Sequence, residues 1–302
     1  MTRRARGFCL LIILFSIHFF PSLSMASDQA DFYQALGKLV DHATHKRPGI
    51  VLWLDLKTKE QKIFGKVELA EQKFRPGSVF KLLTAEAALE RFSTTTYHCV
   101  GHDKIAGKIR HCWRREGHGW MDLAGAIAWS CNLYFSRLGL LLGAQDFKTE
   151  LTLYPFLDPL PLMSEEKLQA EMPNLAIGDS PWFRLSPLQM AQFWKAYLAK
   201  LGDPHYAVIL QGLQRASQEG TASGASPNGI KILAKTGTAD SETKQYATDA
   251  WLVAAYPDLN PRFALVIFLQ EAYGFREPAR LAKKIFSLAD RNHVLEAGIV
   301  KM

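Results

Sequence analysis

Strand-forming segments lie toward both ends of this chain and enclose a long stretch with helical periodicity. Residues 49–65, GIVLWLDLKTKEQKIFG, place two β-rich runs around the polar turn KTKEQ, which predicts a hairpin. Three more strands and a closing helix are predicted at residues 230–239, 249–257, 262–270 and 277–291. Residues 84–200 are mostly helical in pattern. This order predicts an α+β fold whose sheet takes strands from both chain ends, with a helical subdomain inserted between them.

The N-terminal residues have the composition of a secretory signal. Three arginines precede an apolar run over residues 8–20, and Ser24-Met25-Ala26 has the small-x-small pattern of a cleavage site. We therefore predict that residues 1–26 are a signal peptide and that the chain is exported. An uncleaved anchor, which would bring the chain into contact with the membrane, is the alternative. The apolar run is short for a bilayer span of about 20 residues, which favours cleavage.

The remaining residues, 27–302, are predicted to form one domain. The chain is 48% hydrophobic, as in ordinary globular proteins, and no Pro/Gly/Ser-rich linker or repeat divides it. Loss of residues 1–26 removes three arginines and no acidic residue, so the formal charge falls from +7 to +4. The sequence has no nucleic-acid-binding signature. The most basic stretch, RHCWRREGH, predicts a solvated face; a site for an anionic polymer is the alternative.

Cysteine use fits export, because one cysteine lies in the predicted signal and three follow it. Cys99 and Cys112 lie 13 residues apart in a polar stretch, and we predict a disulfide between them. Cys131 follows an apolar helical pattern and is predicted to be a small buried side chain. The alternative for the polar stretch is a zinc site using the two cysteines with His98, His102 and His111. That spacing matches no familiar zinc-ligand pattern, so no metal is predicted.

Three short motifs carry possible chemistry. Residues 78–81 form an S-x-x-K tetrad at the start of the helical segment RPGSVFKLLTAEAALERF, which places Ser78 and Lys81 on one helix face. Residues 130–132 form S-x-N in the helical middle, and residues 235–237 form K-T-G at the end of a predicted strand. The first two patterns also occur elsewhere, at 164–167, 241–244 and 226–228, whereas K-T-G occurs once. Taken alone, Ser78 could equally be the polar first residue of a buried helix.

The three motifs in this order resemble those of the penicillin-binding protein transpeptidase domain family and its serine β-lactamase relatives. GHGWMDLAGAIAWSCNLYFSRLG resembles the family's segment around S-x-N, and RLSPLQMAQFWKAYL resembles its TPLQMA helix. GTA at 220–222 resembles the segment upstream of K-T-G. Together these segments cover nearly everything from about 49 to 290. The resemblance implies an antiparallel sheet flanked by helices, with the active site between the sheet and the helical subdomain, and it implies no cofactor.

The resemblance assigns roles in a serine acyl transfer. A serine hydroxyl needs a base, and a lysine serves only if burial or a nearby cation keeps its amine neutral. Ser78 is thus the implied nucleophile, Lys81 its base and Lys235 the nearby cation. Ser130 is implied to pass a proton to the leaving nitrogen. Asn132 is implied to hold the substrate amide or to orient the base.

The K-T-G motif is implied to hold the substrate. Lys235 and Thr238 are placed to receive its terminal carboxylate, and Thr236 belongs to the same binding strand. Gly237 is expected to let this strand approach the substrate closely. The family's oxyanion hole corresponds to the backbone N–H groups of Ser78 and Thr238.

The implied function is a D,D-transpeptidase that acts on D-Ala-D-Ala stem peptides of peptidoglycan and is acylated by β-lactams. The place of action is the periplasm or the outer face of the bacterial cytoplasmic membrane. A serine β-lactamase or D,D-carboxypeptidase is the alternative, and an acylated β-lactam or muropeptide sensor is a third. Glu165, Glu166 and Glu171 lack the asparagine that follows a class A deacylation base, and Asn132 argues against class D.

The sequence also departs from the family pattern. IGDSPWFRLSP stands where relatives have a glycine-rich GQG, so Trp182 and its neighbours are expected to reshape one wall of the site. Trp251 is predicted to lie in the core, and Asp249 receives no role. About fifty residues separate the predicted cleavage site from Ser78, too few for a glycosyltransferase or pedestal. We therefore expect no docking domain for a glycosyltransferase.

Overall fold

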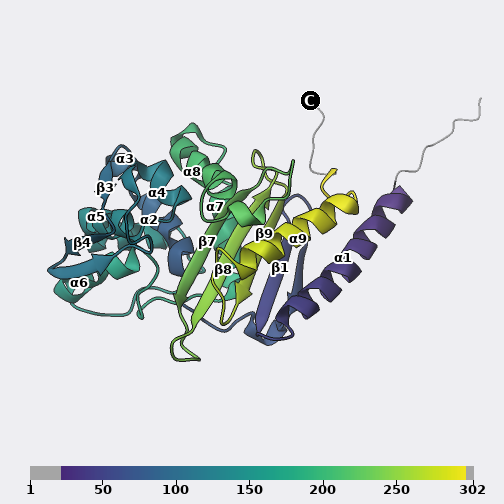
Figure 1. Cartoon of the computed structure of the whole chain (residues 1–302), viewed down its shortest axis with the longest axis horizontal. Coiled ribbons are helices and arrows are strands. Elements are labelled where there is room, and N and C mark those ends of the chain that lie inside the picture. The colour runs from purple at the N-terminus through teal and green to yellow at the C-terminus, as the bar shows by residue number, and fades with distance from the viewer. Residues whose placement is uncertain (1–21, 297–302) are drawn as a thin grey trace, which may run out of the picture.

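The computed structural model describes residues 22–296, which are built around a five-stranded antiparallel sheet in the order β2-β1-β9-β8-β7 (Figure 1). Its strands are β1 Gly49–Asp55, β2 Gln61–Gly65, β7 Leu233–Asp240, β8 Thr248–Tyr256 and β9 Phe263–Leu269. The hairpin β1–β2 pairs with the C-terminal strands through β9. The predicted α+β sheet with strands from both ends of the chain is therefore confirmed.

The sheet is covered on both faces. Every residue of β1 and β9 is buried, and alternate side chains along each strand point to opposite faces. On one face, Trp53 of β1 packs against Phe32 and Phe286. These two rings belong to α1 (Ser22–Thr44) and α9 (Glu277–Arg291), the helices that cover this face in Figure 1. The other face joins the core of the helical region.

The helical region lies between β2 and β7 in the chain, as predicted. It contains η2 Gly77–Phe80, α2 Lys81–Ala87, α3 Leu89–Phe92, α4 Leu123–Ala128, α5 Asn132–Thr152, α6 Glu165–Leu175, α7 Pro187–Leu198 and α8 Ala207–Gln218. Short 3-10 turns add η1 Val67–Leu69, η3 Pro204–Tyr206 and η4 Ser223–Ala225. Helices α2 to α6 lie to one side of the sheet, whose edge strand β7 faces them (Figure 1).

The start of α7 shows how local sequence sets a helix boundary. The Ser186 hydroxyl accepts from the Gln189 backbone N–H at 3.2 Å, and the Gln189 side chain accepts from the Ser186 N–H at 2.9 Å. Pro187 stands at the first helical position, where no N–H is needed. This capping box ends the loop between α6 and α7.

The polar stretch over residues 94–119, for which the pattern predicts a loop, instead contributes to two small ribbons over residues 97–121. One pairs β3 Tyr97–Cys99 with β6 Gly119–Met121, and the other pairs β4 His102–Ile105 with β5 Lys108–His111. The β4–β5 turn is Ala106-Gly107, with φ of +50° and +77°. Two positive φ angles suit a tight hairpin turn, but alanine there is not the usual Asn-Gly or Asp-Gly signal. The sequence pattern therefore missed it.

The disulfide expected between Cys99 and Cys112 is not formed in the structure, where Cys99, Cys112 and Cys131 are all free and buried. The physical reason is that the two predicted partners converge on a third cysteine and a histidine instead of on each other alone. Cys131 is fully buried, as predicted. The histidines considered as zinc ligands, His98, His102 and His111, are exposed and lie outside this group.

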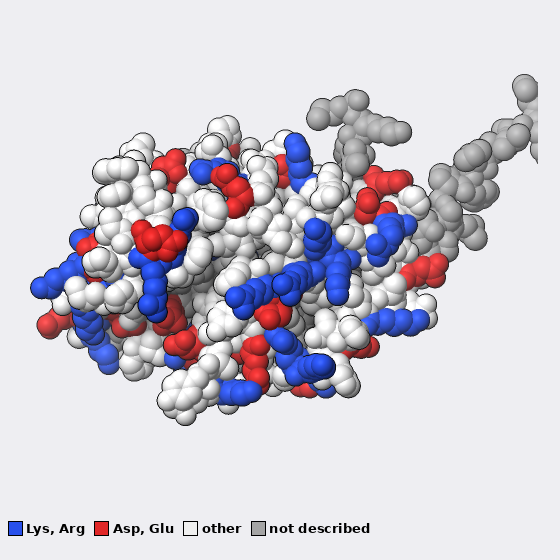
Figure 2. Space-filling model, viewed as in Figure 1, with Lys and Arg blue, Asp and Glu red and all other residues white. Residues whose placement is uncertain are grey.

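The predicted signal peptide, residues 1–26, falls almost wholly outside the described residues. Within the part of the chain that the structure covers, no helix combines the length and apolarity needed to span a bilayer. Basic side chains gather over α9 on the face seen in Figure 2. Shallow grooves beside this helix are lined by Arg280, Lys283, Lys284 and Arg291. The stretch 110–118 is a solvated face only in part: Arg115 is exposed, whereas Cys112 is buried and Arg110 is partly buried against Asn174.

Candidate active site

Ser78 lies in the 3-10 turn η2, immediately before α2. The sequence predicted an α-helix from Ser78, whereas α2 begins at Lys81; a 3-10 turn still aligns residues i and i+3 on one side. Gly77 precedes the serine with φ of +54°, and a Cβ there would lie 2.7 Å from the Thr238 carbonyl oxygen. Glycine therefore lets η2, which we call the serine turn, lie directly against strand β7. The Ser78 side chain is partly exposed.

Lys81 is fully buried, and its amine is held by the S-x-N turn. Its Nζ donates to the Ser130 carbonyl at 2.8 Å, the Ser130 Oγ at 3.2 Å and the Asn132 Oδ1 at 2.7 Å. Burial lowers the pKa of Lys81 to about 8, against an opposing pull from Cys112, Cys131 and Asp179. Close to one amine in ten is then neutral at pH 7, which a general base requires.

Ser130 lies between two buried amines. Its Oγ accepts from Lys81 and, at 2.8 Å, from Lys235 Nζ. Both lysines donate to this oxygen, so the hydroxyl proton of Ser130 is left to point toward another acceptor. The residue has φ of +52°, a left-handed conformation that is uncommon for serine and is held here by the surrounding contacts. This arrangement suits a group that donates a proton into the site.

Lys235 is fully buried on β7, where its Nζ also donates to the Thr236 carbonyl at 2.9 Å. Burial and, second, the nearby Lys81 amine hold the pKa of Lys235 well below its usual range. No carboxylate is bonded to either lysine among the described residues. Two amines with no anionic partner form a site that an incoming carboxylate would satisfy.

The rest of K-T-G packs tightly against the serine turn. A Cβ on Gly237 would lie 2.9 Å from the Pro76 carbonyl oxygen and 3.1 Å from the Trp251 Cβ. The crowding at Gly237 is therefore with the protein itself. The Thr238 hydroxyl accepts from the Gly274 N–H at 3.0 Å, and the Thr236 hydroxyl donates to Thr221 at 2.8 Å. Thr221 belongs to the GTA segment at 220–222.

The predicted site residues meet at one open pocket of about 710 Å³. It is lined by Ser78, Ser130, Asn132, Thr236, Gly237 and Thr238. Lys81 and Lys235 lie buried behind this lining. Both amines donate hydrogen bonds to Ser130, which lines the pocket. The Ser78 hydroxyl makes no hydrogen bond to a described residue, so it is the unbonded hydroxyl of the group.

An aromatic rim, which the sequence motifs did not predict, surrounds this pocket. Trp113, Trp129, Tyr273 and Phe275 line it together with Arg276. Three of these aromatics, Trp113, Tyr273 and Phe275, are 46–49% exposed. The available signal was their place in polar, glycine-containing loops, where no strand or helix pattern calls for a buried ring.

The loop IGDSPWFRLSP touches the site at its start but not at Trp182. The Gly178 carbonyl accepts from the Gly77 N–H at 3.0 Å, which ties this loop to the serine turn. Trp182 does not line the pocket; Lys167 Nζ lies 4.6 Å from its ring centre.

Trp251 is fully buried and donates to the Arg75 carbonyl, which confirms its core position. Buried Asp249 accepts from the Glu271 N–H.

Comparison with known proteins agrees with this geometry. The model of the penicillin binding protein transpeptidase domain family matches residues 49–287. Stage V sporulation protein D of Bacillus subtilis (strain 168) is 36% identical over 76 residues, which make up 24% of this chain and 12% of that protein. The aligned segment thus spans only a small part of that relative.

Solved structures share the fold. The D,D-transpeptidase domain of a peptidoglycan glycosyltransferase from Eggerthella lenta superposes with a TM-score of 0.73 at 20% identity, covering 87% of this chain and 82% of that one. The transpeptidase domain of penicillin-binding protein 3 from Burkholderia pseudomallei gives a TM-score of 0.73 at 18% identity, with 92% and 96% covered. The chain belongs to the penicillin-binding protein transpeptidase domain family.

Proposed function

We propose that this chain is a D,D-transpeptidase-type serine acyl-transferase that acts on D-Ala-D-Ala stem peptides of peptidoglycan outside the cytoplasm. The observation that carries the proposal is the pair of buried lysines converging on Ser130 Oγ beside Ser78. Two buried amines around one hydroxyl would be a costly core arrangement without a function. As an acyl-transfer site, the same arrangement supplies a base, an acid and an anion-binding cation.

Acylation begins with attack by Ser78 Oγ on the substrate carbonyl while the neutral Lys81 amine takes the hydroxyl proton. The new bond joins Ser78 Oγ to the carbonyl carbon. When the carbon–nitrogen bond breaks, Ser130 gives its proton to the leaving nitrogen. Lys81, which contacts the Ser130 Oγ, then returns a proton to Ser130. The protons balance, because the one removed from Ser78 replaces the one given by Ser130.

The terminal carboxylate of the substrate is held by Lys235 with the hydroxyls of Thr236 and Thr238. In the free protein, burial and the Lys81 amine depress the pKa of Lys235. A bound carboxylate favours the charged form of that lysine, so substrate binding itself restores the cation that holds it. A penicillin carries a carboxylate in the same place and would use the same anchor.

The pocket favours transfer of the acyl group over its hydrolysis. No aspartate or glutamate is among the residues described as lining it, so no carboxylate stands ready to activate a water there. Glu165 and Glu166 lie exposed on α6. This absence supports a transpeptidase over a β-lactamase, and an acyl-enzyme that lasts long enough to meet an amine acceptor.

The proposal is tested by covalent labelling with a fluorescent penicillin, followed on denaturing gels during a chase with unlabelled drug. Wild-type protein and Ser241→Ala, a change in a different S-x-x-K match, should be labelled equally and stay labelled for hours. Ser78→Ala should show no label. Label lost within seconds would identify a β-lactamase, and label that survives in Ser78→Ala would contradict the proposed nucleophile.

A second assay separates the transpeptidase from the carboxypeptidase. A D-Ala-D-Ala pentapeptide is incubated with a labelled D-amino acid, and the products are resolved by mass. Incorporation of the D-amino acid with release of D-alanine is the expected result. Release of D-alanine without incorporation would assign a carboxypeptidase. Slow acylation by penicillin with neither peptide product would assign a sensor.

A further inference from the structure

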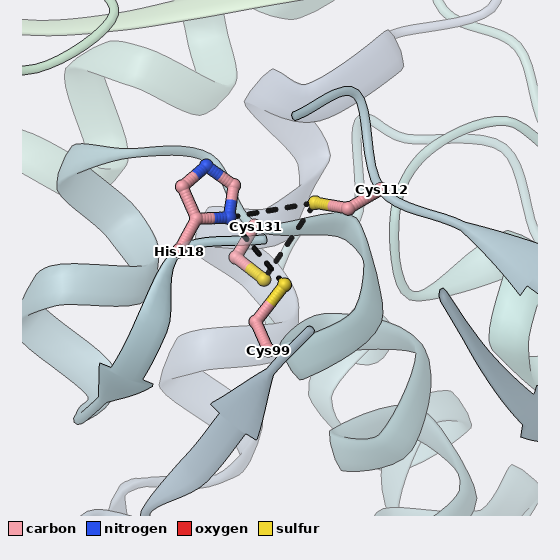
Figure 3. A group of neighbouring side chains, drawn as sticks. All are labelled: Cys99, Cys112, His118 and Cys131. Carbon is pink, nitrogen blue, oxygen red and sulfur yellow. Dashed lines mark hydrogen bonds between the residues drawn. The ribbon is translucent and has the colours of Figure 1, made fainter. Parts of the chain in front are cut away.

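Three cysteines and one histidine gather at the S-x-N turn, and the proposed acyl transfer uses none of their side chains. Cys99, Cys112, His118 and Cys131 each offer one ligand atom, and all four atoms lie within 4.8 Å of one another. Figure 3 shows the four side chains pointing toward a common centre. The three sulfur-bearing residues are buried, and His118 is partly buried.

Three of the six distances between these ligand atoms match a tetrahedral metal site, and the other three are no longer than 4.8 Å. Cys112 Sγ lies 3.9 Å from Cys131 Sγ, and His118 Nδ1 lies 3.5 Å from Cys112 Sγ and 3.6 Å from Cys99 Sγ. Around tetrahedral zinc, with Zn–S of about 2.3 Å and Zn–N of about 2.0–2.1 Å, two sulfurs stand about 3.8 Å apart. The same geometry puts sulfur and nitrogen about 3.6 Å apart. A disulfide would need two sulfurs about 2.05 Å apart.

The backbone brings these residues together through close approaches that only glycine permits. The His118 N–H donates to the Cys99 carbonyl at 3.0 Å, and the Cys112 N–H donates to the Gly101 carbonyl at 2.8 Å. A Cβ on Gly101 would lie 1.8 Å from the Arg115 carbonyl oxygen, and one on Gly117 would lie 2.1 Å from that of Cys99. Both glycines have positive φ. The segment is therefore folded specifically around the cysteines.

The two ribbons are short and bury few side chains, although ion pairs such as Arg137–Asp103 also tie them to the helical region. Each is a two-stranded hairpin or ladder of three or four residues per strand, and isolated ribbons of this kind are marginally stable. Most of their side chains are exposed or partly buried. A small irregular segment of this kind commonly depends on a metal or a disulfide. A disulfide uses two cysteines, whereas this centre has three and a histidine.

We propose that Cys99, Cys112, Cys131 and His118 bind one structural Zn²⁺ ion. Sulfur and imidazole ligands in tetrahedral array are the donor set that zinc prefers, and four protein ligands leave no open position for a reactant. Binding releases the thiol protons as three thiolates form, and His118 binds through Nδ1. This site departs from the sequence-based expectation of no metal, because two of its ligands, His118 and Cys131, lie outside the set considered there.

The site would hold the catalytic turn in place. Cys131 is the central residue of S-x-N and the N-cap of α5, so its neighbours in the chain are Ser130 and Asn132. Both contact Lys81. A metal bond at Cys131 would hold this turn on the side of the cluster, and the two lysines would hold it on the side of the pocket. The metal bond would also support the left-handed backbone of Ser130. The metal ligands are thus positioning residues for the proposed reaction.

The first experiment measures zinc in the purified full chain by elemental analysis and its ligands by X-ray absorption. We expect one zinc per chain with three sulfurs at about 2.3 Å and one nitrogen at about 2.0–2.1 Å. Cys112→Ser should lose most of the metal, whereas the matched control His111→Ala, an exposed histidine next to it, should keep it. Should Cys112→Ser fail to fold, Co²⁺ added to metal-stripped wild-type protein should still give thiolate-to-cobalt absorption.

Several results would overturn the metal site. These are a wild-type chain without metal, iron or copper in place of zinc, a ligand shell without sulfur, full zinc in Cys112→Ser, or a Cys99–Cys112 disulfide found by peptide mass. The positioning role has its own test. Stripping zinc should slow penicillin labelling at Ser78 at least tenfold, and adding Zn²⁺ should restore the rate.

The two proposals fail separately. This inference rests on the proposed function only for its effect on labelling, since zinc content and the Co²⁺ spectrum need no active enzyme. Zinc in a chain that never reacts with penicillin would overturn the proposed function and leave the metal site supported. An unchanged labelling rate in the stripped chain would overturn the positioning role alone.

Discussion

Among single residues, the buried amine of Lys81 matters most for the proposed acyl transfer. Its three hydrogen bonds all go to the S-x-N turn, so its position is set by Ser130 and Asn132 more than by Ser78. Burial, partly opposed by Cys112, Cys131 and Asp179, brings its pKa to about 8. Lys81 can accept a proton only when its amine is in the neutral form.

This predicts how acylation depends on pH. The neutral fraction of Lys81 rises about tenfold per pH unit below about 8 and levels off above it, so the rate of penicillin acylation should follow the same curve. Stopped-flow labelling from about pH 6 to about pH 9 measures it. Lys81→Arg, which stays protonated throughout, should be inactive at every pH. A rate that does not change with pH would contradict the assigned base.

The sequence alone predicted most of the residues that meet in the pocket. Short motifs suffice for this because the chemistry needs those residue types at those spacings. They could not show which atoms bond. The Ser130 Oγ accepts from both amines, and its backbone is left-handed, which no local preference of serine predicts. The rim residues Trp113 and Phe275 were missed for a related reason. They line the pocket as exposed side chains of irregular loops, which have no periodic sequence pattern.

At the scale of elements, the site depends on a few close backbone approaches. Gly178 has φ of +75°, and a Cβ there would lie 2.0 Å from the Gly77 carbonyl oxygen. Gly107, in the β4–β5 turn, has φ of +77° with nothing within 4 Å of its added Cβ. These two glycines have the same backbone conformation but different surroundings.

The pair separates backbone strain from crowding. Gly107→Ala should lower the free energy of unfolding by about 1 kcal/mol, the cost of a left-handed alanine. Gly178→Ala should cost about 3 kcal/mol or more, because the serine turn must also shift, and it should slow acylation of Ser78. Urea denaturation and penicillin labelling measure both effects. Equal costs for the two substitutions would contradict the close packing described between the 178–187 loop and the serine turn.

Elements with strong periodic signals were predicted well. The closing helix over residues 277–291 and the hairpin at 49–65 appear as α9 and as β1 with β2, because one buried face per element is enough to fix them. The ribbons at 97–121 were missed. Their polar residues give no alternation, and their shape follows from glycines and from the cysteine cluster, which are contacts between segments rather than local patterns.

At the scale of the whole molecule, the sheet and the helical region share a core that includes a buried polar cluster. Glu86 accepts from Tyr154, Lys200 and Tyr206, which come from separate segments. Glu150 of α5 lies beside this cluster with a buried, unpaired Oε1. Burial first, and then Glu86, raise the pKa of Glu150 from 4.5 to about 7.

This predicts that the contribution of Glu150 to stability falls as pH rises across that range. The folded state keeps the Glu150 proton between about pH 4.5 and pH 7 while the unfolded chain loses it, so unfolding becomes easier with rising pH. Glu150→Gln should raise the free energy of unfolding by about 1–2 kcal/mol at about pH 7.5 and much less at about pH 5. Urea denaturation at both values measures this. The exposed change Glu165→Gln should show no such difference, and an equal gain from Glu150→Gln at both pH values would contradict the account.

The overall architecture was predictable because the order of elements restricts the topology. Strands at both ends of a chain around a helical middle must meet in one sheet if each is to bury its apolar side chains. The sequence could not predict the fate of the cysteines in the same way. Whether three thiols form a disulfide or a metal site depends on distances that only the folded chain defines.

Peptide mass mapping of the full chain after reaction with benzylpenicillin shows directly whether Ser78 is the nucleophile. We expect one covalent adduct per chain, on the peptide that contains Ser78, which persists through digestion and is absent when Ser78 is replaced by alanine. An adduct on any other residue, or an unmodified Ser78 after prolonged reaction of folded protein, would contradict it.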